Sequence, residues 1–190
     1  MPPQSVPPCS KPVYFHLPTQ GHGYLSQWYH SPFTHAGTTY ATTEMWMMVQ
    51  KARLFHDAAT ATRMIDTLDP KTHKALGRQV KGFDQKIWDE YKSPLVEAGN
   101  YHKFTVSDDA ATLRGLLLST GDREIVEASP YDRVWGIGFA ESVAESNRRR
   151  WGGNLLGKAL ERVRSRLREE EERREQQQEE EEEEGKRKAE

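Results

Sequence analysis

The end of the chain is too strongly charged to belong to a packed core. Residues 169–190 contain 12 acidic and 5 basic side chains, and no large apolar residue follows Leu167. A charge run of this kind is typical of a solvated helix, because it has no apolar face to bury. The hydrophobic core must therefore form from the preceding residues. We expect residues 168–190 to be a charged, low-complexity helical tail that projects from the domain.

The rest of the chain carries the opposite charge. The 190 residues include 29 acidic and 27 basic side chains, so 17 acidic and 22 basic ones remain in residues 1–168. A mildly basic body suits an anionic ligand. A net charge of about +5 spread over a domain is, however, no nucleic-acid footprint by itself.

The N-terminal end indicates an intracellular protein without a membrane anchor. Cys9 is the single cysteine, so no intramolecular disulfide can form and a reducing compartment is expected. No run of 18 apolar residues occurs, and residues 1–12 are rich in proline without the apolar stretch of a secretory signal. We expect a disordered leader over residues 1–12, no membrane partner and a cytoplasmic or nuclear location.

Apolar periodicity and turn residues predict one α+β domain over residues 13–167. It should be mainly helical with a small β-sheet, and its last helix should continue into the tail. Strands are expected at residues 13–15, 124–128 and 134–139, with a hairpin over 31–40 that turns at Ala36-Gly37. Helices are expected at residues 44–55, 58–68, 71–76, 84–98, 110–119 and 154–174, the first of them capped by Thr42 or Thr43.

The helix at residues 44–55 provides the first candidate site. Glu44 and Lys51 lie about 20° apart around this helix and roughly 10 Å apart along it. A carboxylate can stabilise an oxocarbenium-like C1′ or activate water, and a lysine can form a Schiff base with a ring-opened ribose. Alternatively, Glu44 only interacts with the helix dipole and Lys51 extends past the core into solvent.

The second candidate is a turn that follows the strand at residues 124–128. Asp132 and Arg133 lie in this turn, and Trp135 precedes glycines at positions 136 and 138. A carboxylate, a guanidinium and a large aromatic face suit a ligand made of base, sugar and phosphate. A structural Asp–Arg turn over a core tryptophan would explain the same pattern.

Two further segments are candidates for phosphate binding. A Gly-Gly pair leads through Asn154 into the last helix, whose free N–H groups can hold an anion, although Asn154 can equally be a plain helix cap. Lys74, Arg78 and Lys81 can bind phosphate or form a solvated face. No Walker loop, dinucleotide fingerprint or metal-ligand spacing occurs, so neither a metal nor a cofactor is expected.

Seven ordered segments together resemble the NADAR (YbiA-like) domain family over about residues 14–167. They are residues 23–33, 43–52, 76–84 with Trp88, 103–104, 117–121, 126–138 and 151–157. The resemblance implies an α+β domain that cleaves N-glycosidic bonds. Two departures leave the substrate open. Residues 27–30 read Gln-Trp-Tyr-His where family members often have Asn-Phe-Tyr-Pro, and residues 106–107 read Val-Ser where they often have Gln-Asn.

The resemblance also implies roles for individual residues. The family's helix carboxylate and lysine correspond to Glu44 and Lys51, which together with Asp132 are the expected catalytic residues. The residues expected to bind substrate lie in the matched segments: Ser26, Arg78, Trp88, Arg133, Trp135 and Asn154.

Two substrate classes are associated with the family. The favoured prediction is hydrolysis of the C1′–N bond that joins ADP-ribose to a guanine-type nucleobase, with nucleic acid as one carrier of the modification. The alternative is hydrolysis of phosphoribosylamino intermediates of riboflavin synthesis, in which case the partner is a phosphoribosyl metabolite. A third reading is a non-catalytic module that binds ADP-ribose.

Overall fold

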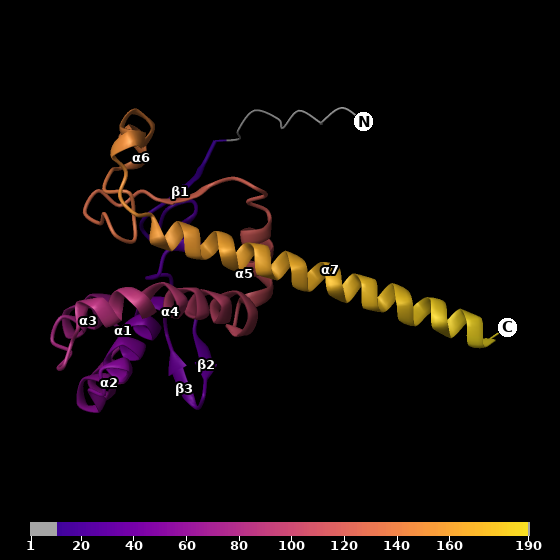
Figure 1. Ribbon diagram of the computed structural model, residues 1–190, viewed down its shortest axis with the longest axis horizontal. Helices are drawn as coiled ribbons and strands as arrows, with labels where there is room; N and C mark the ends of the chain where they lie inside the picture. Colours follow the sequence, from indigo (N-terminus) through magenta and orange to yellow (C-terminus); the bar gives the residue numbers. More distant parts are fainter. Residues whose placement is uncertain (1–10, 190) are drawn as a thin grey trace.

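The computed structural model describes residues 11–189, which form a mainly helical domain with one helix extending far beyond it (Figure 1). The predicted leader lies outside the described residues except for Lys11 and Pro12. The strands are β1 (Val13–Phe15), β2 (Phe33–His35), β3 (Thr38–Tyr40) and β4 (Ile125–Glu127). The helices are α1 (Thr43–Leu54), α2 (Ala58–Ile65), α3 (Pro70–Gly77), α4 (Gln85–Val106), α5 (Ala110–Leu118), α6 (Glu141–Ala144) and α7 (Leu155–Ala189), with 3-10 turns η1 (Gly23–Leu25) and η2 (Glu145–Arg150).

Helix α1 lies at the centre of the domain, in contact with α2, α3 and α4. It begins where predicted, because the Thr42 hydroxyl accepts a hydrogen bond from the Met45 N–H and caps the first turn. Every residue from Thr43 to Val49 is buried. A polar side chain on such a helix needs a partner or a cavity, and this requirement applies to Glu44 in the first turn.

The four strands form two separate pairs. β1 and β4 are parallel, with Phe15 opposite Glu127. β2 and β3 form the predicted antiparallel hairpin, whose turn places Ala36 at φ 48° and Gly37 at φ 75°. The left-handed backbone of this turn explains the glycine at its second position. The parallel pair matters for function, because it brings the start of the chain beside the residues that follow β4.

The expected strand at residues 134–139 is wrong. This segment is an irregular loop whose carbonyl groups accept hydrogen bonds from the start of α7. The carbonyls of Arg133, Val134 and Trp135 accept from the N–H groups of residues 153, 155 and 156 at 2.8, 3.2 and 3.1 Å. The helix N-terminus thus occupies backbone groups that a neighbouring strand would need.

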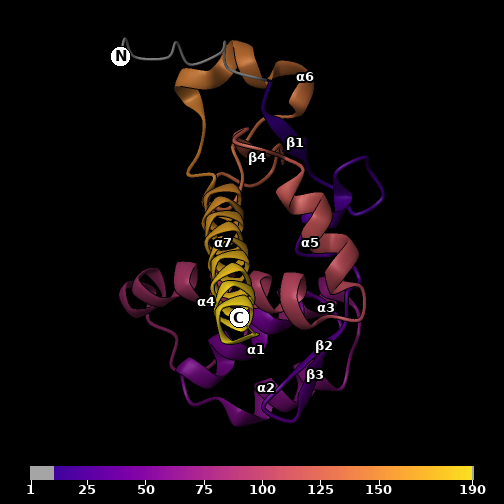
Figure 2. The ribbon, with the colours of Figure 1, turned by 90° about the vertical axis from the view of Figure 1, so that its right-hand side faces the viewer.

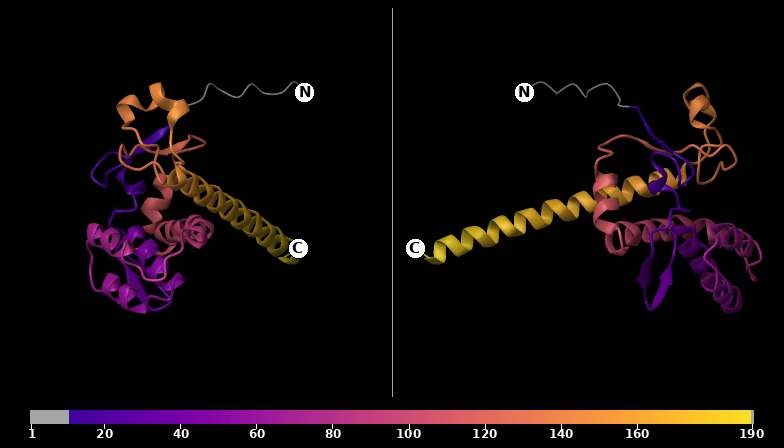
Figure 3. Two further views of the ribbon diagram at one scale, coloured as in Figure 1. Left: turned by 60° about the vertical axis from the view of Figure 1, so that its left-hand side comes forward. Right: turned by 180° about the vertical axis from the view of Figure 1, so that it is seen from behind.

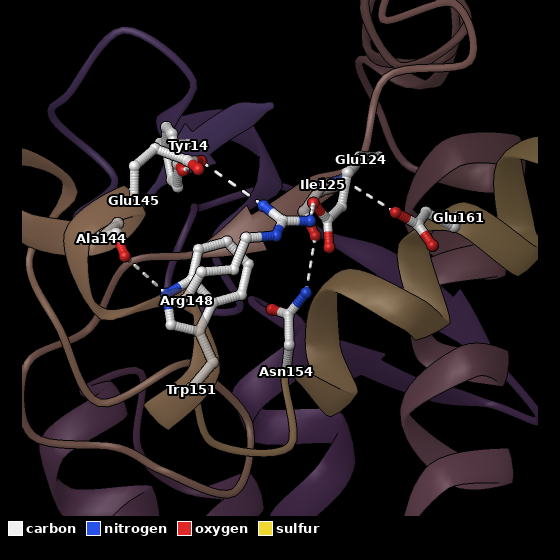
Figure 4. Close-up of polar contacts among 9 residues, drawn as sticks. All are labelled: Tyr14, Glu124, Ile125, Ala144, Glu145, Arg148, Trp151, Asn154 and Glu161. Atoms are coloured by element: carbon white, nitrogen blue, oxygen red, sulfur yellow. Dashed lines mark hydrogen bonds and ion pairs between the residues drawn. The ribbon is translucent and has the colours of Figure 1, made fainter. Parts of the chain in front are cut away.

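Residues 141–150, for which the sequence predicts no element, form α6 and η2 beside the β1–β4 pair (Figure 2). Figure 4 shows how this segment is fastened to the strands. The Tyr14 hydroxyl donates a hydrogen bond to Glu145, and Arg148 forms ion pairs with both Glu145 and Glu124. These polar contacts hold a segment that has little apolar surface of its own.

Helix α4 is longer than predicted, because it continues past residue 98 to Val106. Pro94 lies inside it, so this proline does not end the helix. The continuation contains the buried residues Asn100, Lys103 and Phe104. Helix α2, by contrast, ends three residues earlier than predicted.

Helix α7 is continuous from Leu155 to Ala189, but only its first part packs on the domain (Figures 1 and 3). Its last contacts with the domain are a hydrogen bond from the Tyr101 hydroxyl to Glu170 at 2.9 Å and an ion pair between Arg114 and Glu171 at 2.9 Å. Residues 172–188 are exposed. The predicted projecting helix is confirmed. No helix within residues 11–189 combines the length and apolar character needed to cross a bilayer.

Candidate active site

A cleft of about 720 Å³ lies between the start of α1, the segment that follows η1 and the loop after β4. Its volume suits a small-molecule ligand. Five aromatic side chains line it: Trp28, Phe83, Trp88, Tyr131 and Trp135. The cleft walls are therefore largely aromatic, and the charged side chains lie among these apolar faces.

The first turn of α1 places the Glu44 side chain in this cleft. The Glu44 peptide N–H donates to the Gln27 carbonyl at 3.0 Å, which ties the first turn of α1 to the opposite cleft wall. The side chain is only 5% exposed. Burial raises the pKa of the Glu44 carboxyl to about 7, and the nearby Asp132 adds to this shift, whereas the Lys74 charge and a hydrogen bond from Trp28 oppose it.

Lys51 lines the same cleft, two turns further along α1. Its ammonium group donates to the Gly77 carbonyl at 2.7 Å and lies 4.2 Å from the Phe83 ring centroid and 5.4 Å from that of Trp88. Burial lowers the pKa of the Lys51 amine. A lysine with a lowered pKa is a better nucleophile at neutral pH, as Schiff-base chemistry requires.

Asp132 and Trp135 both line the cleft, as the sequence indicated. One carboxylate oxygen of Asp132 accepts hydrogen bonds from the N–H groups of Val134 and Trp135, each at 2.8 Å. The same residue therefore shapes its turn and presents negative charge to the cleft. Asp132 therefore fits both alternatives considered for this turn, a structural role and a role in the site.

Glu127 was not predicted as a site residue, yet its side chain lines the cleft. Burial raises the pKa of the Glu127 carboxyl to about 8, with the negative charges of Asp132 and Glu44 adding to the shift and Lys74 opposing it. The signals in the sequence were a carboxylate at the end of the apolar strand Ile125-Val126 and its place in the matched segment 126–138.

Several buried polar atoms at the cleft have no hydrogen-bond partner among the described residues. They are the Gln27 Oε1, the His16 Nδ1 and the Glu127 Oε2 atoms. An unpaired buried polar atom is costly, and such atoms at a cavity are natural partners for a ligand. Gln27 also belongs to the segment that departs from the family pattern.

Ser26 and Trp88 lie in the cleft wall. The Ser26 hydroxyl accepts a hydrogen bond from the Trp28 N–H at 3.3 Å, and the Ser26 carbonyl accepts one from the ammonium group of Lys103 at 3.0 Å. Lys103 is completely buried, and this burial lowers its pKa to about 7. The lysine of the Lys103-Phe104 pair thus supports the cleft wall from behind.

Three residues expected to bind substrate do not line the cleft. Arg78 is exposed at the end of α3, and of the basic residues around it only Lys74 reaches the cleft. Arg133 points away: its guanidinium donates to the Arg150 carbonyl at 2.8 Å and lies 5.7 Å from the ring centroid of Phe139.

Asn154 is the third of these, and its amide is fully engaged with strand β4. Its Oδ1 accepts from the Glu127 N–H at 3.1 Å. Its Nδ2 donates to the Ile125 carbonyl at 2.9 Å (Figure 4). The Gly-Gly segment before it offers no phosphate seat either, because the N–H groups of residues 152–156 already donate to the carbonyls of residues 133–137. The expected roles of Asn154 and of the Gly-Gly segment both assumed that the N-terminus of α7 has free polar groups. In the structure, the loop after β4 and strand β4 already bind these groups.

No three His, Cys, Asp or Glu side chains within residues 11–189 are arranged to hold a metal ion. The groups that line the cleft include three carboxyls, three lysine amines and three indole rings. These features define an α+β domain with an acid-lined cleft for a small organic ligand, which is the kind of site that glycoside hydrolysis requires.

The chain belongs to the NADAR domain family, whose model matches residues 14–168. It is 40% identical over 127 residues to an N-glycosidase of Acanthamoeba polyphaga mimivirus, covering 66% of this chain and 73% of that protein. It is 31% identical over 156 residues to an N-glycosidase of Nostoc punctiforme, covering 82% of this chain and 92% of that protein. The predicted class, an N-glycosyl hydrolase, is confirmed by these relatives.

A solved structure and a third relative also match this chain. The NMR structure of the Escherichia coli protein YbiA superposes with a TM-score of 0.67 at 24% identity, covering 86% of this chain and 88% of that chain. This likeness confirms the predicted α+β class. A riboflavin biosynthesis protein of Vibrio vulnificus is 28% identical over 159 residues, which is 84% of this chain but 39% of that protein.

Proposed function

We propose that this protein hydrolyses the C1′–N bond between ADP-ribose and a guanine-type nucleobase. The observation that carries the proposal is the meeting of Glu44, Asp132 and Lys51 in one cleft with indole rings on its walls. Breaking a C1′–N bond leaves positive charge on the ribose, which carboxylates stabilise. Indole faces suit the planar base that leaves. Free nucleobases and modified bases in a nucleic acid are both candidate carriers.

In this mechanism the carboxylate form of Glu44 takes a proton from the water that attacks C1′. Asp132 lies beside it and adds negative charge near the ribose. Lys51 offers a second route, in which its amine adds to C1′ and the C1′–N bond breaks, its electron pair going to the base nitrogen, which takes up a proton. Opening of the ribose ring then leaves an imine between Lys51 and C1′, and water hydrolyses it to return the amine and release ADP-ribose. The lowered pKa of Lys51 supports this route.

A second candidate function is hydrolysis of phosphoribosylamino intermediates of riboflavin synthesis. The observation that favours it is the Vibrio vulnificus relative, whose name refers to riboflavin biosynthesis. The same cleft groups would serve, because the scissile bond is again C1′–N. The two candidates differ in the group attached to the ribose phosphate.

A side-by-side turnover experiment separates these candidates. Release of ADP-ribose from an ADP-ribosylated guanosine is compared with release of ribose phosphate from a phosphoribosylamino pyrimidine. We expect faster turnover of the first, with loss of activity in Glu44→Gln. Absence of ADP-ribose release by wild type would refute the proposal. Tight ADP-ribose binding in calorimetry without any turnover would indicate a binding module.

Borohydride reduction during turnover tests the Schiff base separately. An imine on Lys51 would be reduced to a stable amine, so the protein mass should rise by that of the bound sugar. Lys51→Ala should form no adduct. Active wild type that forms no adduct would exclude the imine route and leave direct attack by water.

A further inference from the structure

The backbone of Glu127 is held on both sides. Its N–H donates to the Asn154 Oδ1 at 3.1 Å, and its carbonyl accepts from the Ile137 N–H at 3.0 Å. Its neighbour Ala128 donates to the Phe15 carbonyl at 2.8 Å, at the end of the β1–β4 pair. The direction of the Glu127 side chain is therefore fixed by the fold.

Asn154 provides the most specific of these restraints. Its amide bridges residues 125 and 127 of β4, while its own backbone has the left-handed φ of 47° that asparagine tolerates. One turn into α7, Gly157 allows this close approach, since a Cβ there would lie 2.0 Å from the Ile125 carbonyl. The start of α7 is thus pressed directly against the strand that ends in Glu127.

The carboxyl group of Glu127 has no such restraint. Its Oε2 is buried without a partner at the cleft, and three charged side chains from other segments act on it: Glu44 from α1, Lys74 from α3 and Asp132 from the following loop. Two of the three are carboxylates. Ionisation of Glu127 would add a further negative charge beside these carboxylates and is therefore unfavourable. In its protonated form the Glu127 carboxyl can donate its O–H to a ligand.

We propose that Glu127 is the general acid of the glycosidase and that Asn154 is the residue that positions it. This inference rests on the proposed function. As the C1′–N bond breaks, its electron pair moves to the nitrogen, and the Glu127 proton is transferred to that nitrogen. Water then adds to C1′ and its proton passes to the Glu44 carboxylate. Proton exchange with solvent returns both carboxyl groups to their starting forms.

The pKa values support this division of roles. The pKa of Glu127 is raised to about 8, so the group is mainly protonated at pH 7. The pKa of Glu44 is raised only to about 7, so a substantial fraction of it is ionised at the same pH. Because both carboxyl groups titrate near neutral pH, one can carry a proton while the other is ionised, as acid and base roles require.

The test compares two leaving groups on the same ADP-ribosyl group. A guanine nitrogen needs a proton in order to leave, whereas the nicotinamide of NAD leaves as a neutral molecule without one. We expect Glu127→Gln to slow ADP-ribosylguanosine hydrolysis roughly 10²- to 10⁴-fold and to slow NAD hydrolysis far less. It should also remove the fall in kcat/KM above about pH 8. Glu124→Gln, three residues earlier and outside the cleft, should retain wild-type rates.

Asn154→Ala tests the positioning role. We expect kcat for ADP-ribosylguanosine to fall with KM little changed, and the alkaline limb of the pH profile to shift, because the Glu127 backbone loses the hydrogen bond that fixes the direction of its side chain. A variant that only loses thermal stability and keeps the wild-type pH profile when folded would overturn this role.

The outcomes also distinguish this inference from the proposed function. Wild type that cleaves no N-glycoside contradicts the proposed function and therefore both proposals. Active wild type with an unaffected Glu127→Gln variant, or with equal losses for both leaving groups and an intact alkaline limb, contradicts only the general-acid role.

Discussion

Glu44 gives the clearest expectation at the scale of single residues. Its pKa is raised to about 7, and the proposed mechanism uses its ionised form. Activity should therefore fall as the pH decreases through 7, because protonated Glu44 cannot accept the proton of water. We expect kcat/KM measured between pH 5.5 and 7.5 to show this acid limb. Glu90→Gln, an exposed acid on α4, should leave the limb unchanged, and a flat wild-type profile would contradict the role of Glu44.

Trp88 should matter for binding more than for chemistry. Its ring lies in the cleft wall and contacts the Lys51 ammonium group. Loss of base stacking costs roughly 1–3 kcal/mol, so Trp88→Leu should raise KM about tenfold or more with a smaller effect on kcat. Trp88→Phe keeps an aromatic face and should recover most of the affinity. Steady-state kinetics would detect the opposite pattern, a large loss of kcat at constant KM.

The residues that the sequence could identify are those positioned by local structure. Glu44 and Lys51 share one helix, and Asp132 and Trp135 share one turn, so their spacing already indicates a common surface. Glu127 could not be identified from the sequence, because its raised pKa depends on burial and on charged side chains from α1, α3 and the following loop. Arg133 and Asn154 lie outside the cleft because their polar side-chain groups already have partners within the fold, which residue type alone does not reveal. Arg78 also lies outside it, exposed at the end of α3.

At the scale of elements, helix α4 carries a buried charge whose effect on stability depends on pH. The pKa of Lys103 is lowered to about 7 in the folded protein from its usual 10.5. The unfolded chain therefore binds more protons between these values, so wild-type stability should rise with pH there and lose this gain as pH falls towards 7.

Lys103→Met removes the titrating group while keeping much of its length. Relative to this variant, wild type should gain up to ~1.4 kcal/mol of unfolding free energy per pH unit between pH 8 and 10. Urea unfolding at pH 8, 9 and 10 measures the difference. A difference that stays constant over this range would mean that Lys103 does not titrate there.

The same scale explains which elements the sequence could predict. Caps such as Thr42 and Asp57 and apolar periodicity mark α1 and the start of α2. The strand expected at residues 134–139 failed because the backbone partners of that segment come from α7, which begins 16 residues further on. Helix α4 passes Pro94 because its continuation is buried against the core, a tertiary effect that overrides the local preference.

At the scale of the whole molecule, α7 divides into a packed part and a free part. Within the described part of residues 176–190, no ion pair or hydrogen bond joins the helix to the domain. Deleting this segment should therefore leave both melting temperature and kcat close to wild type. Deleting residues 168–190 also removes the contacts of Arg168 with Asp122, of Glu170 with Tyr101 and of Glu171 with Arg114.

The longer deletion should lower the melting temperature by a few degrees, since each exposed pair contributes up to about 1 kcal/mol. Differential scanning fluorimetry of the two truncated chains measures both effects. A large loss of stability in the shorter deletion would mean that the free part of α7 supports the domain.

The projecting helix also makes the molecule a strong permanent electric dipole. Residues 169–190 carry 12 acidic and 5 basic side chains at one end, and the body at the other carries 22 basic and 17 acidic ones. The exposed helix beyond the domain separates these charges by roughly 20 Å or more, given a rise of about 1.5 Å per residue. In dilute salt such a particle turns in the field of its neighbours and favours head-to-tail encounters, whereas physiological salt screens most of that field within about 8 Å.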